Sequence, residues 1–355
     1  MFGTVPATTA IPATEDRRIA VVASELLGRP GTGGAGTADS LLAVALARHG
    51  YSVDLIVASG REIGELNSEW SAIYDSAGVR IRVLDRLPGV EPAYLRPSYE
   101  VWQALAAVQP DVAIVDDWRA LGWAALRARH AGLGLTQTAF VVHCHGVGRV
   151  LVEFAQKVPD TLDRFGESVA ERAALELADA VVSPSAWLLD WFRAHRWLLP
   201  ESAQVIQYLR QSAALHQPVD PVHHEGQVRR LAFFGQLREG KGIRIFLDAL
   251  DQLDPVDVVF LGAASKRWPR EELMRRAPGA RVENELTREA ALEELRLPGT
   301  LAVMPSLLDN SPNTVAECIE NGIPFVATAT GGIAELVAED DRAGGGAQCG
   351  EAACP

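Results

Sequence analysis

The sequence predicts an α/β protein with two domains, each built on a parallel β-sheet. Its 355 residues suffice for two domains of ordinary size, each with a hydrophobic core. Short apolar runs typical of buried strands alternate with helical patterns. An apolar strand followed by a loop with several glycines occurs twice, beginning at Ile19 and at Leu231. The organisation that we expect is an arm (1–16), a first domain (17–206), a linker (207–229), a second domain (230–340) and a tail (341–355).

The composition indicates a globular protein and excludes some classes of partner. Hydrophobic residues make up 48% of the chain, and the net charge of −13 argues against nucleic acid as a ligand. No apolar run approaches the roughly 18 to 20 residues that span a bilayer, and the N-terminus lacks a basic segment followed by an apolar core. The four cysteines show no metal-binding spacing. We therefore expect a cytoplasmic protein, with peripheral membrane contact left open.

The first domain begins with a strand, a glycine loop and a helix. We expect a strand at Ile19–Ala23, a loop over 28–36, a helix at Ala38–Arg48 and a second strand at Val53–Val57. The loop matches neither a Walker phosphate-binding loop nor the GxGxxG dinucleotide fingerprint. From its residues alone, the loop is explained by glycines that permit a tight turn with positive φ.

Polar residues follow two later strands of this domain, which also has an expected strand at Arg80–Leu84. The strand Asp111–Val115 ends in Asp116-Asp117-Trp118, which is not a metal-binding DxD motif. We interpret these residues as a strand-end cap and a packing tryptophan, with substrate contact as the alternative. The strand Ala139–Val142 leads into His143-Cys144-His145.

The two histidines after this strand share one face of an extended chain, so a two-histidine metal site is one alternative. That site needs further ligands, and the other histidine cluster is His223-His224, in the expected linker. Trp187 and Trp191, four residues apart in the next helix, are predicted to belong to the core.

The second domain is expected to open with the strand Leu231–Phe234, followed by a loop that contains Gln236, Arg238 and Lys241. The next strand is expected at 257–262. Further on, apolar runs at Leu301–Val303 and Phe325–Thr328 predict two buried parallel strands.

The helix between these last two strands is predicted from its cap and its apolar face. Ser311 would be the N-cap and Pro312 the first helical residue, while Val315, Cys318 and Ile319 form the apolar face.

This strand-helix-strand unit places the loop 306–311 at the carboxyl edge of the sheet, where open α/β sheets bind ligands. The N-termini of the helix at Pro312 and of a second helix entered through Gly331-Gly332 would suit a diphosphate. The carboxylates of Asp309 and Glu317 would accept hydrogen bonds from sugar hydroxyls. The alternative for Glu317 is a solvated side chain, because it lies off the apolar face.

Several motifs of the sequence resemble those of a known family. Asp309-x7-Glu317 and the end Gly331-Gly332-Ile333-Ala334-Glu335 are similar to the signature of retaining, nucleotide-sugar-dependent GT-B glycosyltransferases of family 4 (glycosyl transferases group 1), whose first acid is Glu. The run 178–185 resembles the family's ADxVVSPS strand, and Asp116-Asp117-Trp118 resembles the acid-Trp pair of starch-synthase-like relatives.

The resemblance covers about Ile19 to Glu335 and implies two Rossmann-like domains that face each other across a cleft. Because the family pattern stops after Glu335, we expect a truncated C-terminal domain.

The resemblance also implies roles for particular residues. His145, with His143 as the fallback, would lie beside the donor sugar. Lys241 matches the family lysine that clamps the diphosphate, whereas Gln236 replaces the family arginine and Arg238 is its candidate substitute. The full set comprises His145 and Asp309 as catalytic residues; Gln236, Arg238, Lys241, Asn310, Ser311, Asn313, Thr314 and Glu317 for the donor, with Glu317 on the ribose; and Gly33 and Gly34 against the donor phosphates or the acceptor.

The activity implied is transfer of a sugar from a nucleotide-diphosphate sugar to an acceptor hydroxyl with retention of configuration. The acceptor would be a carbohydrate, a lipid-linked molecule or a small molecule. No metal or other cofactor is expected, because Lys241 and helix N-termini would neutralise the diphosphate. Two alternatives are a sugar-nucleotide epimerase of the same fold and a binding module without turnover, the latter suggested by Gln236 and Asp309.

Overall fold

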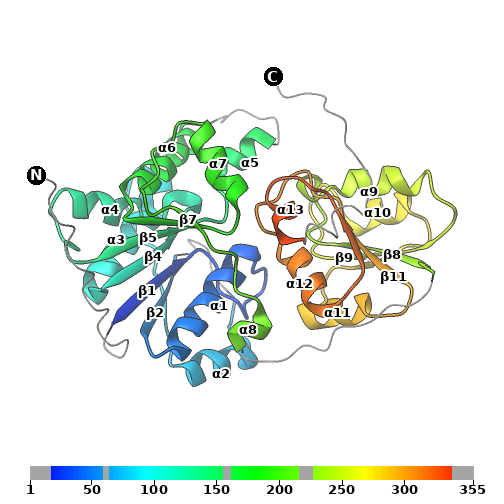
Figure 1. Ribbon diagram of the computed structural model, residues 1–355, viewed down its shortest axis with the longest axis horizontal. Helices are drawn as coiled ribbons and strands as arrows, with labels where there is room; N and C mark the ends of the chain where they lie inside the picture. The colour runs from blue at the N-terminus through cyan, green and yellow to red at the C-terminus, as the bar shows by residue number, and fades with distance from the viewer. Residues whose placement is uncertain (1–16, 59–63, 155–160, 216–226, 338–355) are drawn as a thin grey trace, which may run out of the picture.

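The computed structural model describes residues 17–58, 64–154, 161–215 and 227–337, and these form two sheets, each covered by helices (Figure 1). The expected arm 1–16, the tail 341–355 and the pair His223-His224 lie outside the described residues. The expected strands, among them Ile19–Ala23 and Leu231–Phe234, are found with ends shifted by at most one residue.

The first sheet has seven parallel strands in the order β3-β2-β1-β4-β5-β6-β7. The chain therefore starts in the middle of the sheet and winds outward in both directions, as Rossmann-like sheets do. The strands are β1 (Arg18–Ala23), β2 (Ser52–Val57), β3 (Arg80–Val83), β4 (Val112–Asp116), β5 (Ala139–His143), β6 (Ala180–Ser183) and β7 (Gln204–Val205).

Helices pack on both faces of this sheet through two separate apolar clusters. One cluster includes Leu41 of α1 and Tyr74 of α2, and the other includes Leu105 of α3, Leu175 of α6 and Phe192 of α7. The helices are α1 (Gly34–Arg48), α2 (Ser68–Ala77), η2 (Ala93–Leu95), α3 (Arg96–Val108), η3 (Trp118–Ala120), α4 (Trp123–His130), α5 (Gly148–Phe154), α6 (Leu162–Leu177) and α7 (Ala186–Ala194).

The second sheet has five parallel strands in the order β10-β9-β8-β11-β12. Its strands are β8 (Arg230–Phe234), β9 (Asp257–Leu261), β10 (Arg281–Glu283), β11 (Thr300–Met304) and β12 (Phe325–Ala327). Its helices are η4 (Glu239–Lys241), α9 (Ile243–Leu250), α10 (Arg270–Arg276), α11 (Arg288–Leu295), α12 (Asn313–Asn321) and α13 (Ile333–Leu336). The two predicted parallel-sheet domains are therefore present.

Two predicted helix starts are wrong, by four residues for α1 and by one residue for α12. Helix α1 begins at Gly34 rather than Ala38, because Gly33 in an extended conformation serves as its N-cap and the following small residues are helical. Helix α12 begins at Asn313, and its N-cap is Pro312 rather than Ser311. Pro312 has ψ of 122°, so its ring sets φ without starting the helix.

The segment between the domains is more ordered than the expected linker. It contains the short helix α8 (Gln211–Leu215), although we expected no periodic structure there. Ala214 and Leu215 are buried in the same cluster as α1, so the start of this segment is packed onto the first domain. Within the described parts of the chain, no helix combines the length and apolar character that a bilayer span requires.

Candidate functional site

A buried cluster of polar side chains lies where β5 ends. The carboxylate of Asp39, on α1, accepts hydrogen bonds from Nδ1 of His143 at 2.8 Å and from Nε2 of His145 at 3.1 Å. The Asp39 side chain is 1% exposed, and both imidazole rings are nearly as inaccessible. The two histidines thus meet at one carboxylate, which the sequence analysis did not identify.

Both ring nitrogens of His145 carry a proton in this arrangement. The hydroxyl of Tyr208 donates to the carbonyl oxygen of Cys144 at 3.0 Å, so it accepts from Nδ1 of His145 at 2.7 Å. Nε2 faces the Asp39 carboxylate and is the other donor. Burial alone would lower the pKa of His145, but Asp39 and Asp116 outweigh it and raise the pKa to about 10.

The same electrostatics act on Asp39 in the opposite direction. Burial would raise its pKa, but the hydrogen bonds and positive charge from His145 and His143 lower the pKa to about 2. The result is an ion pair inside the first domain. Because both nitrogens of His145 are occupied within the protein, its expected hydrogen bond to a donor sugar stays a prediction.

Asp39 also completes a group that could hold a metal ion. Among the described residues, one ligand atom from each of Asp39, His143 and His145 lies within 4.8 Å of the others. The two-histidine alternative therefore gains the third ligand that it needed. The sequence signal for Asp39 was that it is the one acidic residue in an otherwise small and apolar helix.

The pair Asp116-Asp117 caps the end of β4, as predicted. Asp116 accepts from the N–H of Trp118 at 2.7 Å, and Asp117 accepts from the N–H groups of His145 and Gly146 at 2.8 and 3.1 Å. Asp117 therefore fixes the backbone that carries His145. Trp191 is buried and stacks on His195, which confirms its core assignment.

Loops of the two domains are joined directly by hydrogen bonds. Asn310 accepts from the hydroxyl of Ser185 and donates through Nδ2 to the carbonyl oxygen of His145 at 3.4 Å. The carboxylate of Glu335 accepts from the N–H groups of Ala186 and Trp187, at the start of α7, at 2.7 and 2.8 Å. The structure is thus a closed arrangement of the domains.

The glycine loop takes part in this closure. The N–H of Gly33 donates to the carboxylate of Glu25 at 2.5 Å, and the carbonyl oxygen of Gly34 accepts from Nδ2 of Asn313 at 3.3 Å. The loop therefore touches the start of α12, where the donor is expected. A role of Gly33 and Gly34 against phosphates or acceptor stays a prediction.

The donor loops of the second domain contain a second ion pair. Lys241, in the turn η4 after β8, donates to the carboxylate of Asp309, which follows β11. Gln236 and Arg238 lie exposed on the same loop as Lys241. The cation that we assigned to the diphosphate and the acid that we assigned to the sugar thus neutralise each other.

The N-terminus of α13, the helix entered through Gly331-Gly332, does not offer the anion site that we expected. The N–H of Gly332 donates to the carbonyl oxygen of Asp309 at 2.9 Å, and α13 has only four residues. Gly331 has φ of 66°, and a Cβ there would lie 2.2 Å from the Asp309 carbonyl oxygen. The two glycines therefore allow close backbone packing against the Asp309 loop.

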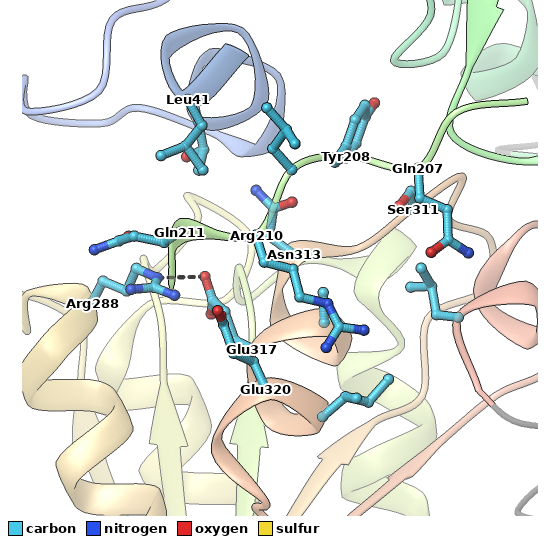
Figure 2. Close-up of a pocket in the computed structure, with 15 residues that line it drawn as sticks. Leu41, Gln207, Tyr208, Arg210, Gln211, Arg288, Ser311, Asn313, Glu317 and Glu320 are labelled. Atoms are coloured by element: carbon cyan, nitrogen blue, oxygen red, sulfur yellow. Dashed lines mark hydrogen bonds and ion pairs between the residues drawn. The ribbon is translucent and has the colours of Figure 1, made fainter. Parts of the chain in front are cut away.

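Glu317 is mostly buried, so the solvated alternative is wrong. Its carboxylate accepts a hydrogen bond from Nε of Arg288, on α11, at 2.7 Å (Figure 2), and the Glu317 side chain is 12% exposed. Burial raises its pKa despite the attraction of Arg288. Arg288 of α11 contacts this helix face, and the interdomain segment, of which residues 207–211 line the adjoining hollow, borders it.

A hollow between the domains borders several predicted donor residues (Figure 2). Ser311, Asn313 and Glu317 line one wall, while Thr37 and Leu41 of α1 line another. Its cavity volume of about 40 Å³ is room for a few waters. A nucleotide sugar would therefore need the domains to separate. In the described part of the chain, the lining does not include Gln236, Arg238, Lys241, Asp309 or Thr314.

Two Rossmann-like domains with parallel sheets, whose site loops meet between them, define the GT-B class of fold. Two family models match this chain: Glycosyltransferase Family 4 over residues 32–207, and Glycosyl transferases group 1 over residues 228–350. The chain therefore belongs to the glycosyltransferase family that these two models describe. It is an enzyme of the class that transfers sugars. No curated protein matches it in sequence.

Similar solved structures share the fold. Sucrose-phosphate synthase from Thermosynechococcus elongatus is 18% identical, with a TM-score of 0.64 over 89% of this chain and 82% of that one. Anabaena HepE in complex with UDP and glucose is also 18% identical, with a TM-score of 0.59 over 91% and 83%. A putative UDP-N-acetylglucosamine 2-epimerase from Listeria monocytogenes is 15% identical, with a TM-score of 0.54 over 90% and 81%.

Proposed function

We propose that this protein transfers a sugar from a nucleoside-diphosphate sugar to an acceptor hydroxyl, with retention of configuration and without a metal ion. The observation that carries the proposal is the hollow between the domains, which has the mostly buried Glu317 at its wall together with Ser311 and Asn313. A carboxylate held in place by Arg288 is suited to accept hydrogen bonds from ribose hydroxyls. The similar structure of HepE with UDP and glucose supports a nucleotide sugar as the donor.

In the proposed reaction the bond between the anomeric carbon and the diphosphate oxygen breaks, and a bond from that carbon to the acceptor oxygen forms. The O–H bond of the acceptor breaks in the same step, and its proton passes to the leaving diphosphate. The loop from Asp309 to Asn313 would hold the sugar, and Glu317 would hold the ribose. Lys241 would stabilise the leaving diphosphate once the donor separates it from Asp309. Asp39 would act through His145, by fixing the orientation and charge of its ring.

The test is product analysis with a panel of UDP-, GDP- and ADP-sugars. We expect one donor to be consumed and the product to keep the anomeric configuration of the donor, as read by proton NMR. Activity should persist after EDTA treatment and should not rise when Zn²⁺ or Mn²⁺ is added. A requirement for added metal would contradict metal independence and would favour the Asp39, His143, His145 group as a metal site.

The second candidate function is that of a sugar-nucleotide epimerase, and the similarity to the Listeria protein is the observation that favours it. In that case the donor would change its configuration at one ring carbon with no acceptor present. A module that binds donors without turnover would show calorimetric binding but neither product. The acceptor class, a cytoplasmic location and peripheral membrane contact stay predictions.

A further inference from the structure

The cations around the proposed donor site differ in whether a carboxylate already neutralises them. Lys241 is paired with Asp309, and Arg288 is paired with Glu317. Arg210, in contrast, makes no side-chain hydrogen bond or ion pair with any described residue. It lies at the start of the segment that leads from the first domain to the second, and its carbonyl oxygen accepts from the N–H of Ala214 in α8.

Arg210 lines the same hollow as the donor residues. Figure 2 shows its side chain extending from the interdomain segment toward α12. Glu317, the expected ribose ligand, and Ser311 with Asn313, expected near the donor sugar, also line this hollow. In a nucleotide sugar the diphosphate connects the ribose to the sugar. Once the domains separate to admit a donor, a molecule that reaches both sets of residues has its diphosphate between them, beside Arg210.

A diphosphate needs positive charge that is free to bind it, and arginine offers a planar set of donors that matches phosphate oxygens. Gln236 has no charge, and Arg238 and Lys241 both lie outside the lining of the hollow among the described residues. Lys241 is in addition paired with Asp309, so it binds a diphosphate only after that pair separates. Resting on the proposed function, we propose that Arg210 binds the donor diphosphate, so that the interdomain segment supplies the cation that position 236 lacks.

This assignment gives the interdomain segment a role in binding. The neighbours of Arg210 hold the segment in place: the Tyr208 hydroxyl bonds to Cys144, and Ser212 donates its N–H to Glu320 of α12 at 3.1 Å. The segment around Arg210 is therefore tied to both domains, while the Arg210 side chain has no partner among the residues that the structure describes. A diphosphate bound to Arg210 would stabilise the approach of α12 to the first domain.

The experiment measures nucleoside-diphosphate binding by calorimetry to the full chain, using UDP, GDP and ADP as probes. For whichever probe binds, Arg210→Gln should raise the Kd about ten-fold, because a charged hydrogen bond is lost. Arg210→Gln should also make Kd less dependent on the salt concentration. Arg210→Lys should retain part of the wild-type affinity and part of its salt dependence. Arg86→Gln is the matched control, since it removes the same charge from an exposed position outside the hollow. Circular dichroism checks that each variant is folded.

Two results would overturn the assignment in distinguishable ways. If the wild type binds a nucleoside diphosphate and Arg210→Gln binds it equally well, Arg210 is not the ligand and the proposed function stands. If only Arg238→Gln weakens nucleoside-diphosphate binding, Arg238 rather than Arg210 binds the diphosphate. If the folded wild type binds none of the three probes at millimolar concentration, the proposed function fails and the assignment of Arg210 fails with it.

Discussion

The ammonium group of Lys241 is bound to the carboxylate of Asp309, so each neutralises the other at the carboxyl edge of the second sheet. Both side chains are about four-fifths buried, with 20% and 17% of their surface exposed. The pair therefore competes with any diphosphate for the lysine. Donor binding must either separate the two groups or use another cation.

This competition predicts the effect of removing the acid. Asp309→Asn should tighten nucleoside-diphosphate binding by up to about five-fold, since a partly exposed pair contributes roughly 1 kcal/mol at most. Sugar transfer should fall in the same variant, because the contact to the donor sugar is weakened. Calorimetry and turnover assays measure the two effects. Lys241→Ala serves as the opposite case and should abolish turnover with weakened binding; tighter binding in Lys241→Ala would contradict the role of the lysine.

Glu317 is predicted to be essential for donor use. Glu317→Ala should abolish nucleotide-sugar turnover, because the buried carboxylate at the wall of the hollow is lost. Glu320→Ala is a comparison on the same helix, since Glu320 also lines the hollow but bonds to Ser212. Its loss should affect turnover less. Equal kinetics of Glu317→Ala and the wild type would remove Glu317 from the site.

The partner of Glu317 should matter for stability. Arg288→Ala leaves the Glu317 carboxylate mostly buried without its cation, so the free energy of unfolding should fall by about 2 kcal/mol. The combined change of Arg288→Ala with Glu317→Gln should recover part of this loss, because a neutral side chain is easier to bury. Urea unfolding of the three variants tests the coupling. A double variant less stable than Arg288→Ala would argue against it.

The contact of Glu335 with α7 predicts an effect on domain closure. Glu335→Ala removes the acceptor for the N–H groups of Ala186 and Trp187, which are in the other domain. The closed arrangement should become less populated, and the radius of gyration from small-angle X-ray scattering should rise. Glu289→Ala, on α11, is a control in the same domain. An unchanged scattering curve for Glu335→Ala would show that other contacts suffice for closure.

The ion pair of Asp39 and His145 predicts how stability depends on pH. His145 has a pKa of about 10 in the folded protein, raised from 6.5, so the folded state binds one more proton than the unfolded state between these values. Its stabilising contribution is complete below pH 6.5 and is lost as the pH rises toward 10. The contribution of Asp39 is present above pH 3.8 and is lost as the pH falls toward 2.

The measurement is urea unfolding between pH 6.5 and 9.5. Asp39→Asn should lower the free energy of unfolding at pH 6.5. In this variant the free energy of unfolding should also fall less steeply as the pH rises, because His145 then has a pKa nearer its ordinary value. Asp190→Asn, which affects an exposed pair with Arg193, should keep the wild-type slope. A slope unaltered by Asp39→Asn would mean that Asp39 does not set the pKa of His145.

Much of the architecture could be predicted from the sequence because strands and helices leave local patterns. The expected strands were located to within a residue, although β7 and β10 were not predicted, and the order of the short motifs indicated the family before any coordinates. Helix starts were less certain. The N-caps of α1 and α12 are Gly33 and Pro312, and neither makes a side-chain capping hydrogen bond, so no capping side chain marks these two helix starts in the sequence.

The pairings within the site could not be predicted in the same way. Asp39 is separated from His143 by 104 residues, and Lys241 is 68 residues from Asp309. Glu317 looked like a surface residue on its own helix. It is mostly buried, because Arg288 contacts that face and the interdomain segment borders the same hollow, and both are distant in sequence.

The sequence by itself determined the two α/β domains, their strands and their membership of a glycosyltransferase family, because periodicity and short motifs are properties of neighbouring residues. Only the tertiary structure decided which charges are neutralised and which are free. Three features depend on which distant segments the fold brings together: the charge of His145, the mutual pairing of Lys241 and Asp309, and the guanidinium of Arg210, which is unpaired among the described residues. The reason is that electrostatic interactions between buried groups depend on distance in space and on exclusion of water, and neither is encoded in local sequence.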